Sequence, residues 1–264
     1  MLKNCFTLLS VIVLVSSLCI SCMSLKSHLR YTNSSSRRPP IKAFTFVAVQ
    51  HVAEPVECLP SPQFEACKQV LPQMGALTST SSGSGLLVWA KSTPVILTAA
   101  HVCTKSSEPT VYEHKGVKIK IKHWEKIMTR NFTGEFQKSK ILHIDSSKDL
   151  CALSVSKLST APVRVSHKKP KPGDRVYAIS APFGINTPTM NLVFSGHYSG
   201  YDSRWNYYSI PTRPGSSGSV VLDRNYRAVG MLNAAFLDIE HIGIGAGYDD
   251  IKNFLLEISS QKKN

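Results

Sequence analysis

The chain has 264 residues, and 42% of them are hydrophobic, which excludes a chain too polar to build a core and leaves room for one large domain or two small ones. Its formal net charge is +14, and this excess is unevenly spread. Residues 1–40 hold five basic and no acidic residues, and segments 111–140 and 163–175 carry the excess of the remainder.

The N-terminal segment has the layout of a secretory signal. Lys3 precedes an apolar stretch over 6–20, which is shorter than the roughly 20 residues that a transmembrane helix requires. A retained signal anchor is one alternative. Lipid anchoring through Cys22 is another, although Cys19 stands where a bacterial lipobox usually has an aliphatic residue. We therefore expect an exported protein, secreted, periplasmic or membrane-anchored, with a signal peptide or lipoprotein signal over 1–22.

Residues 23–40 are polar and basic and end in two prolines, so we expect a disordered tether there and a folded domain over 41–264. In an exported protein the remaining cysteines meet an oxidising compartment, and their number is even. Cys58 and Cys67 are expected to close a short surface loop. Cys103 and Cys151 form a second possible pair, with two buried free thiols as the alternative.

Beyond the tether, the sequence consists of short β-rich runs divided by turn residues. In chain order they read "AFTFVAV", "SGLLVWA", "PVILTAA", "KGVKIKIKHW", "KILHI", "LCALSV", "RVYAIS", "NLVFSGHYSG", "WNYYSI", "SVVLD", "AVGMLNAAF" and "IGIGAG". About a dozen strands with almost no helical periodicity predict an all-β sandwich or barrel.

A single helix is predicted near the end of the chain. Asp249 or Asp250 can cap the segment "IKNFLLEIS". Four apolar residues then recur at the spacing of one helical face: Ile251, Phe254, Leu255 and Ile258. We expect this face to pack against the β structure.

Three motifs bring together the residue types that activate a serine. A serine hydroxyl becomes a nucleophile when a base takes its proton, and the base needs a carboxylate to hold its tautomer. "VILTAAHVC" supplies His101 at the end of an apolar strand, and "SSKDLCALSV" supplies Asp149 at the start of another. "PGSSGS" supplies Ser217 in a glycine turn, where the N–H groups of Gly215 and Ser217 can form an oxyanion hole.

With these motifs in this order, the chain resembles the trypsin-like serine peptidases of the double β-barrel fold. "TAAH" is similar to the family's histidine motif and "GSSGS" to its Gly-x-Ser-Gly motif. The segments "SGSGLLV", "PGDRVYAISAPFG", "VFSGHYSG" and "AVGMLNAAF" look most like the DegP/HtrA-type and glutamyl-endopeptidase-type bacterial branches, without a PDZ domain. The resemblance implies two packed six-stranded antiparallel β-barrels with the active site between them, and a serine endopeptidase that needs no cofactor or metal.

Several assignments keep alternatives. Asp145 competes with Asp149 for the role of the triad carboxylate, and we prefer Asp149 because it directly opens the apolar strand. Asp145 is then a turn residue. Seen alone, Ser217 reads as part of a Ser/Gly-rich turn and His101 as a core histidine. Ser216 stands where digestive-type enzymes carry an aspartate that pairs with a new N-terminus, so we expect no activation by that route.

The resemblance also implies where the substrate pocket lies. Its walls would come from the stretch before the nucleophile and from a late strand, with a small or medium apolar side chain at the cleaved position. The residues assigned to substrate binding are Pro211, Thr212, Arg213, Leu232, Asn233 and Ala234. Asn233 has a second possible role, a hydrogen bond to the Asp149 carboxylate.

Two other classes of function remain open. A catalytically silent binding protein could use the same scaffold. A basic surface adaptor for membranes or polyanions could use Lys118, Lys120 and Lys122, which alternate with apolar residues and give one strand a cationic face. The commoner explanation is an edge strand guarded by lysines, and nucleic acid is a poor candidate because Trp124 is the one aromatic interleaved there. The expected partner is a protein or peptide substrate, and the sequence does not give the oligomeric state.

Overall fold

The computed structural model describes residues 38–104, 109–236 and 239–261. The predicted signal over 1–22 and nearly all of the tether lie outside the described residues. The chain divides into two units, Met1–Arg38 and Pro39–Asn264, and the fold below is that of the second.

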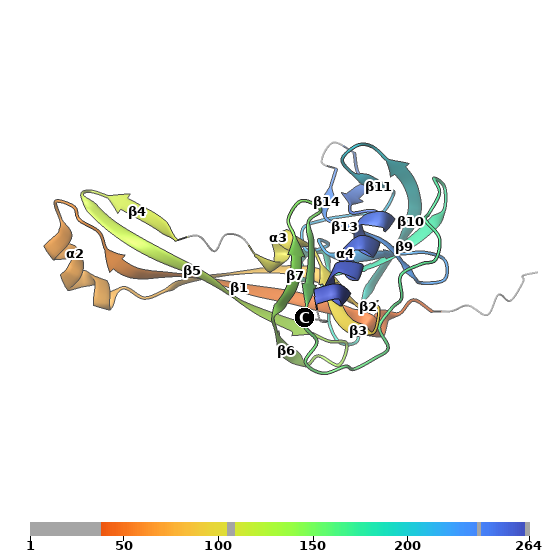
Figure 1. Cartoon of the computed structure of the whole chain (residues 1–264), viewed down its shortest axis with the longest axis horizontal. Helices are drawn as coiled ribbons and strands as arrows, with labels where there is room; N and C mark the ends of the chain where they lie inside the picture. The colour runs from red at the N-terminus through yellow and green to blue at the C-terminus, as the bar shows by residue number, and fades with distance from the viewer. Residues whose placement is uncertain (1–37, 105–108, 237–238, 262–264) are drawn as a thin grey trace, which may run out of the picture. The chain divides into compact units, whose positions relative to one another are not determined.

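The first half of this unit forms an eight-stranded sheet with the order β4-β5-β1-β2-β3-β8-β7, and β6 pairs with β5. Its strands are antiparallel, and most join chain neighbours (Figure 1). They are β1 (Phe44–Cys58), β2 (Leu77–Ala90), β3 (Thr93–Thr98), β4 (Thr110–His114), β5 (Val117–Arg130), β6 (Phe136–Ser139), β7 (Ile141–Asp145) and β8 (Leu150–Leu153).

The second half forms a seven-stranded sheet with the order β13-β12-β9-β10-β11-β15-β14. Its strands are β9 (Arg175–Ser180), β10 (Leu192–Tyr201), β11 (Asn206–Tyr208), β12 (Ser219–Leu222), β13 (Ala228–Leu232), β14 (Ala234–Ala235) and β15 (Gly243–Gly245). Since β13 and β14 stand at opposite ends of this order yet are separated by Asn233 alone, the sheet curls back on itself.

The two sheets share a core, because the largest buried cluster takes side chains from both. Leu97 and Leu153 come from the first sheet, and Val220 and Met231 from the second. A short segment also joins them, since Val163 bridges β2 and Val165 bridges β13. The predicted all-β double-barrel fold is confirmed, although the sheets hold eight and seven strands in the described residues rather than six each.

Helices are few in the described part of the chain. They are the short helices α2 (Phe64–Val70) and α3 (Ala100–Cys103), the longer α4 (Tyr248–Gln261), and the 3-10 turns η1 (Ile41–Ala43), η2 (Leu71–Gln73) and η3 (Pro182–Gly184). None of them is long and apolar enough to cross a bilayer. The predicted C-terminal helix is confirmed as α4, whose four predicted apolar residues are buried in the shared core.

Asp250 caps α4 from inside its first turn. Its carboxylate accepts a hydrogen bond from the Gly247 N–H, which precedes the helix, at 2.9 Å. The helix therefore begins at Tyr248, slightly before the predicted segment, and the negative charge still lies at the positive end of the helix dipole.

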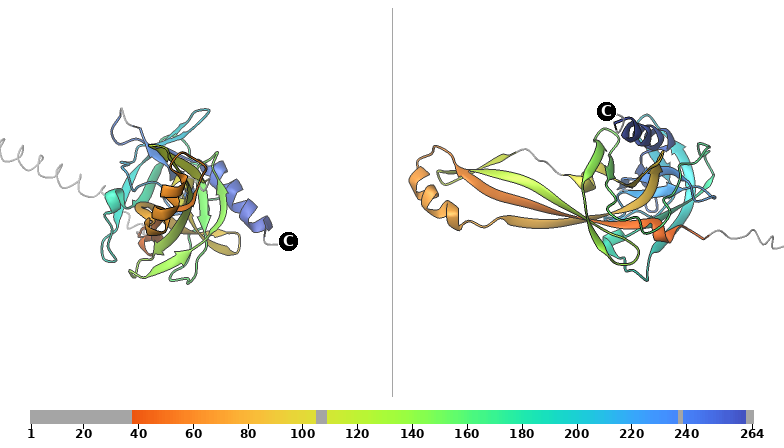
Figure 2. Two further views of the ribbon diagram at one scale, coloured as in Figure 1. Left: turned by 90° about the vertical axis from the view of Figure 1, so that its left-hand side faces the viewer. Right: turned by 60° about the horizontal axis from the view of Figure 1, so that its bottom comes forward.

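Three long strands carry an extension that the sequence did not predict. β1, β2 and β5 continue beyond the barrel, and β4, α2 and η2 are attached to their far ends (Figures 1 and 2). We call residues 50–82 and 109–126 the arm. A small apolar cluster stabilises it, with Cys58, Cys67 and Ile119 buried, and the expected disulfide between the two cysteines is present.

Candidate active site

His101 lies in α3, immediately after the buried strand β3. Its ring Nδ1 lies 2.7 Å from Oδ2 of Asp149, and its backbone N–H donates to Oδ1 of the same carboxylate at 2.9 Å. Half of the His101 side chain is exposed, against 21% of the Asp149 side chain. The carboxylate therefore holds both the ring and the backbone of His101, while much of the ring surface stays open to solvent.

Asp149 reaches His101 because β3 and β8 are neighbours, with Thr98 opposite Cys151. It occupies the turn before β8 with a φ of 53°, a left-handed conformation that Asp tolerates better than most residues. The bridge between Cys103 and Cys151 ties α3 to β8 directly behind the pair. The proposed second disulfide is thus present, and it fixes the two elements that carry His101 and Asp149.

Asp145, the competing carboxylate, is the last residue of β7 and begins the turn that also carries Asp149. Its Oδ1 accepts hydrogen bonds from the N–H and hydroxyl of Ser147 and from the Lys148 N–H. Burial opposes its ionisation, but these hydrogen bonds outweigh burial and hold the pKa of the Asp145 carboxyl below its ordinary value. Its carboxylate therefore stabilises the turn by accepting these hydrogen bonds, as expected of a turn residue.

Ser217 lies in a turn that requires two glycines. Gly215 and Gly218 have φ values of 93° and 87°, which side chains with a Cβ rarely adopt. A Cβ on Gly215 would lie 2.5 Å from the Ala181 carbonyl, and one on Gly218 would overlap the Ser84 carbonyl. The Ser217 hydroxyl donates to the Asn233 carbonyl at 3.0 Å, so in this structure it is directed to the backbone rather than to His101.

The expected oxyanion donors are both available. Among the described residues, neither the Gly215 N–H nor the Ser217 N–H donates a hydrogen bond within the protein. The peptide before Gly215 is held from its other side, since the Phe183 N–H donates to the Pro214 carbonyl at 2.6 Å. Ser216 is fully buried, and its N–H donates to the Arg213 carbonyl at 2.8 Å, so it acts within the turn.

Ser84 is a residue of this site that the sequence reasoning missed. It lies in β2, is fully buried, and bonds to the turn that carries Ser217 through its backbone N–H and its hydroxyl. A signal for it was present in the segment "SGSGLLV", which carried part of the family resemblance. The sequence did not indicate its role, because its partners Gly215 and Ser217 are distant in the sequence.

The residues assigned to substrate binding differ in how much of each is exposed to solvent. Arg213 and Ala234 are exposed, Pro211 is partly exposed, and Thr212, Leu232 and Asn233 are buried. Leu232 belongs to the core of the second barrel, and its carbonyl accepts the Gly218 N–H. Direct contact of the buried side chains with a substrate stays a prediction.

Asn233 does support Asp149, although through the backbone. Its side-chain amide donates to the carbonyls of Lys148 and Asp149 at 3.3 and 3.1 Å, rather than to the expected carboxylate. Its own carbonyl accepts the Ser217 hydroxyl. Asn233 therefore connects the turn that carries Asp149 to the turn that carries Ser217.

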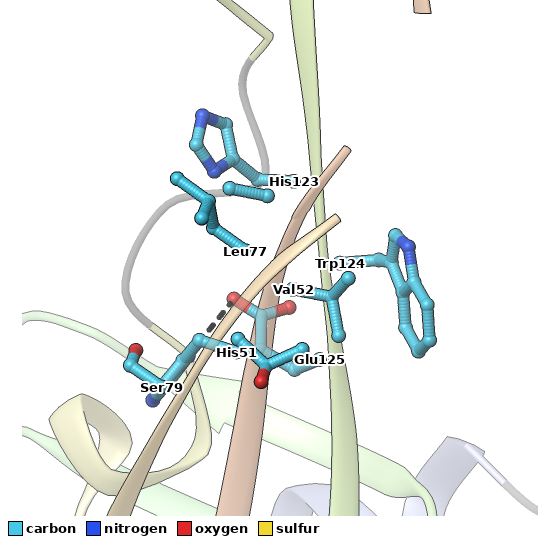
Figure 3. A pocket seen from close by; sticks show the side chains of 9 residues that line it. His51, Val52, Leu77, Ser79, His123, Trp124 and Glu125 are labelled. Carbon is cyan, nitrogen blue, oxygen red and sulfur yellow. Dashed lines mark ion pairs between the residues drawn. The ribbon is translucent and has the colours of Figure 1, made fainter. Parts of the chain in front are cut away.

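The arm holds a second serine, histidine and carboxylate. His51 Nε2 lies 2.8 Å from the Ser81 hydroxyl, and its Nδ1 lies 3.8 Å from Glu125. Figure 3 shows His51 and Glu125 in a pocket of about 280 Å³, which Leu77, His123 and Trp124 also line. Ser81 lies within the extended strand β2, where successive N–H groups point to opposite edges and cannot converge on one oxygen. This set therefore lacks an oxyanion site.

Two lysines of the proposed cationic stripe have acidic neighbours. Lys118 lies 3.3 Å from Glu113, and Lys120 lies 3.4 Å from Glu57. Lys122 stands opposite Glu54 in the strand register. An anionic partner on this stripe stays a prediction, and these glutamates offset part of its charge. In the described residues, no group of three or more His, Cys, Asp or Glu side chains is arranged to hold a metal ion.

Comparisons with known structures show the same fold. A serine endoprotease from Yersinia pestis superposes with a TM-score of 0.57 at 16% identity, covering 84% of this chain and 64% of its own. Rv3671c from M. tuberculosis H37Rv, in an inactive form, gives a TM-score of 0.52 at 16% identity, covering 81% of this chain and 87% of its own. The HtrA-type protease AlgW with a decapeptide gives 0.54 at 18% identity, covering 83% and 64%.

The chain thus spans about two thirds of the length of the first and third of these proteins. A search of curated proteins returns no match. The model of the trypsin-like peptidase domain matches residues 83–231, more than half of the chain, and that range contains His101, Asp149 and Ser217. The chain therefore belongs to the trypsin-like peptidase domain family.

Proposed function

We propose that this protein is an exported serine endopeptidase in which Ser217 is the nucleophile, His101 the general base and acid, and Asp149 the carboxylate that orients His101. The observation that carries the proposal is the two-point contact of Asp149 with His101, at 2.7 and 2.9 Å. Such a contact sets the tautomer with a proton on Nδ1 and leaves Nε2 as the acceptor for a hydroxyl proton.

Catalysis begins with a rotation of Ser217 about its Cα–Cβ bond, from the Asn233 carbonyl toward Nε2 of His101. Nε2 takes the hydroxyl proton while Oγ forms a bond to the carbonyl carbon of the substrate. The substrate oxygen becomes an oxyanion, and the N–H groups of Gly215 and Ser217 donate to it. Nε2 then gives its proton to the leaving amine as the C–N bond breaks, which leaves an acyl group on Ser217.

A water molecule completes the turnover. It gives a proton to Nε2 and bonds to the acyl carbon, and Ser217 regains its proton from Nε2 as the ester bond breaks. Asp149 stays ionised throughout and stabilises the imidazolium form of His101. The substrate class is a protein or peptide, as the names of the structural relatives indicate for those proteins.

Two disulfides support export, because such bonds persist in oxidising compartments and are rare in the cytosol. The N-terminal segment is the proposed signal or anchor, and the route and final location follow from it.

The test is labelling of the purified protein with a fluorophosphonate, which reacts with activated serines, together with hydrolysis of an unfolded protein substrate. We expect labelling and hydrolysis to be lost in Ser217→Ala and His101→Ala. Ser219→Ala and Ser81→Ala are the matched controls, because Ser219 lies beside the same turn and Ser81 contacts the histidine of the arm. Equal labelling of Ser217→Ala and the parent protein would refute the assignment.

The bond from Ser217 to the Asn233 carbonyl also favours a second candidate, a silent protein that binds peptides without cleaving them. A well-folded protein that captures a peptide but takes no label would identify it. The third candidate, the polyanion adaptor, would show steep salt dependence of binding that Ser217→Ala leaves unchanged.

A further inference from the structure

Ser84 forms four hydrogen bonds, two of which join the first barrel to the nucleophile turn. Its N–H donates to the Ser217 carbonyl at 2.8 Å, and its hydroxyl donates to the Gly215 carbonyl at 2.8 Å. The hydroxyl accepts the Ala181 N–H at 2.9 Å, and the Ser84 carbonyl accepts the Thr98 hydroxyl at 2.8 Å. Every polar atom of this fully buried residue therefore has a partner.

These bonds reach the two residues whose N–H groups are the proposed oxyanion donors. Ser84 holds the carbonyls of both Gly215 and Ser217, so the backbone between them is anchored at each end. Gly215 has a positive φ and no side chain to restrict it, so its backbone rotates more readily than that of Ser216 or Ser217. The Ser84 hydroxyl is the one side-chain group, among the described residues, that bonds to the Gly215 carbonyl.

We propose that the Ser84 hydroxyl is a positioning residue for the oxyanion site, acting on the peptide that joins Gly215 to Ser216 and so connects the two donor residues, a role that rests on the function proposed above. Ser84 touches neither the substrate nor the reacting atoms. It fixes the backbone that connects the two donors, whose contacts strengthen as charge develops on the substrate oxygen. Its loss is therefore expected to lower kcat and to leave KM nearly unchanged.

Ser84→Ala tests this role against matched controls. Ser180 and Ser219 are also buried serines near the same turn, and the hydroxyl of each lacks a hydrogen-bond partner in the described residues. Ser180→Ala and Ser219→Ala thus remove a buried hydroxyl without releasing the turn. We expect Ser84→Ala to lose about 10- to 100-fold in kcat, less than the loss of a whole oxyanion donor, and the controls to stay within about twofold.

A second variant and a second measurement keep the inference separate from folding and from the proposed function. Ser84→Cys retains a weak donor of similar size, so its kcat should lie between those of the parent and Ser84→Ala. The amides of Gly215 and Ala181 report on the turn without any activity: both NMR resonances should shift in Ser84→Ala, and the Ala181 amide should exchange faster with solvent.

The possible results distinguish a failure of the proposed role of Ser84 from a failure of the proposed function. Unchanged kcat in a folded Ser84→Ala, or equal losses in the two control variants, would overturn the role of Ser84 while leaving the peptidase proposal intact. Unchanged Gly215 and Ala181 amides would overturn it even in a protein without activity. If the parent hydrolyses nothing, the proposed function fails, and the amide measurement alone decides whether Ser84 holds the turn.

Discussion

Asp149→Asn is the substitution that most directly tests the proposed triad. The Asp149 carboxylate accepts two hydrogen bonds from His101, one at each oxygen. Asparagine has one carbonyl oxygen and an NH₂ group, so it can accept only one of them. If the oxygen keeps the backbone N–H, the NH₂ faces Nδ1 and forces the ring proton onto Nε2, where it blocks the uptake of the Ser217 proton.

The expected loss is about 10⁴-fold in kcat, the size seen when this tautomer is wrong in such a triad, or about 5.4 kcal/mol of transition-state stabilisation. The assay is cleavage of an internally quenched peptide, with kcat and KM measured separately and the fold checked by thermal unfolding. KM should change little, because the substrate contacts remain.

Asp145→Asn is the control, since Asp145 lies four residues earlier and its carboxylate serves a turn. Its kcat should match that of the parent, while its unfolding temperature should fall. Equal losses of kcat in the two variants, or an Asp149→Asn enzyme within tenfold of the parent, would refute the assignment of the carboxylate.

Three further predictions concern a disulfide, the turn that carries Ser217 and an exposed carboxylate. Replacing Cys103 and Cys151 by alanine removes a disulfide with a sequence separation of 48. By the chain-entropy relation, the free energy of unfolding measured with denaturant should fall by about 4 kcal/mol. A loss no larger than that from removing the arm disulfide, with a separation of 9, would contradict this relation. Gly218→Ala should abolish fluorophosphonate labelling and lower the unfolding temperature, because the added Cβ overlaps the Ser84 carbonyl; a labelled, stable variant would contradict the geometry of the turn. Hydrogen bonds from Tyr207, Trp205 and Arg204 lower the pKa of Asp202 to about 2, so its contribution to stability is present above about pH 4 and disappears as the pH falls toward 2; carboxyl NMR titration checks this, and an ordinary pKa would contradict it.

The barrel strands could be predicted because their apolar residues are consecutive and buried. β9 was predicted with its observed bounds, and the buried strands β3, β8 and β12 to within two residues at either end. The triad candidates were found because each lies next to the end of such a strand. There the residues that form its motif are consecutive in the sequence. The disulfide between Cys103 and Cys151 was left open against free thiols, since its formation depends on the pairing of β3 with β8.

The arm could not be predicted as an extension of the barrel, because only its β5 segment, in "KGVKIKIKHW", has an apolar pattern typical of a strand. The first half of β2 reads "LTSTSS", and its side chains are mostly exposed, so Leu77–Ala90 looked like a strand only from Ser84 onward. Its stability comes from pairing with β1, which the sequence does not show. The sequence also did not show α2, a helix of 7 residues that the disulfide from Cys67 to Cys58 ties to the end of β1.

The contacts that hold the Ser217 turn join residues that are made at very different times. Ser84 and Gly215 are 131 positions apart, and Ser217 bonds to Asn233, which is added later still. A growing chain that has already released His101 and Asp149 therefore carries the proposed base with no serine to activate. Under the proposed function, a growing chain cannot cut its neighbours until the segment that holds Ser217 and Asn233 has been made and folded.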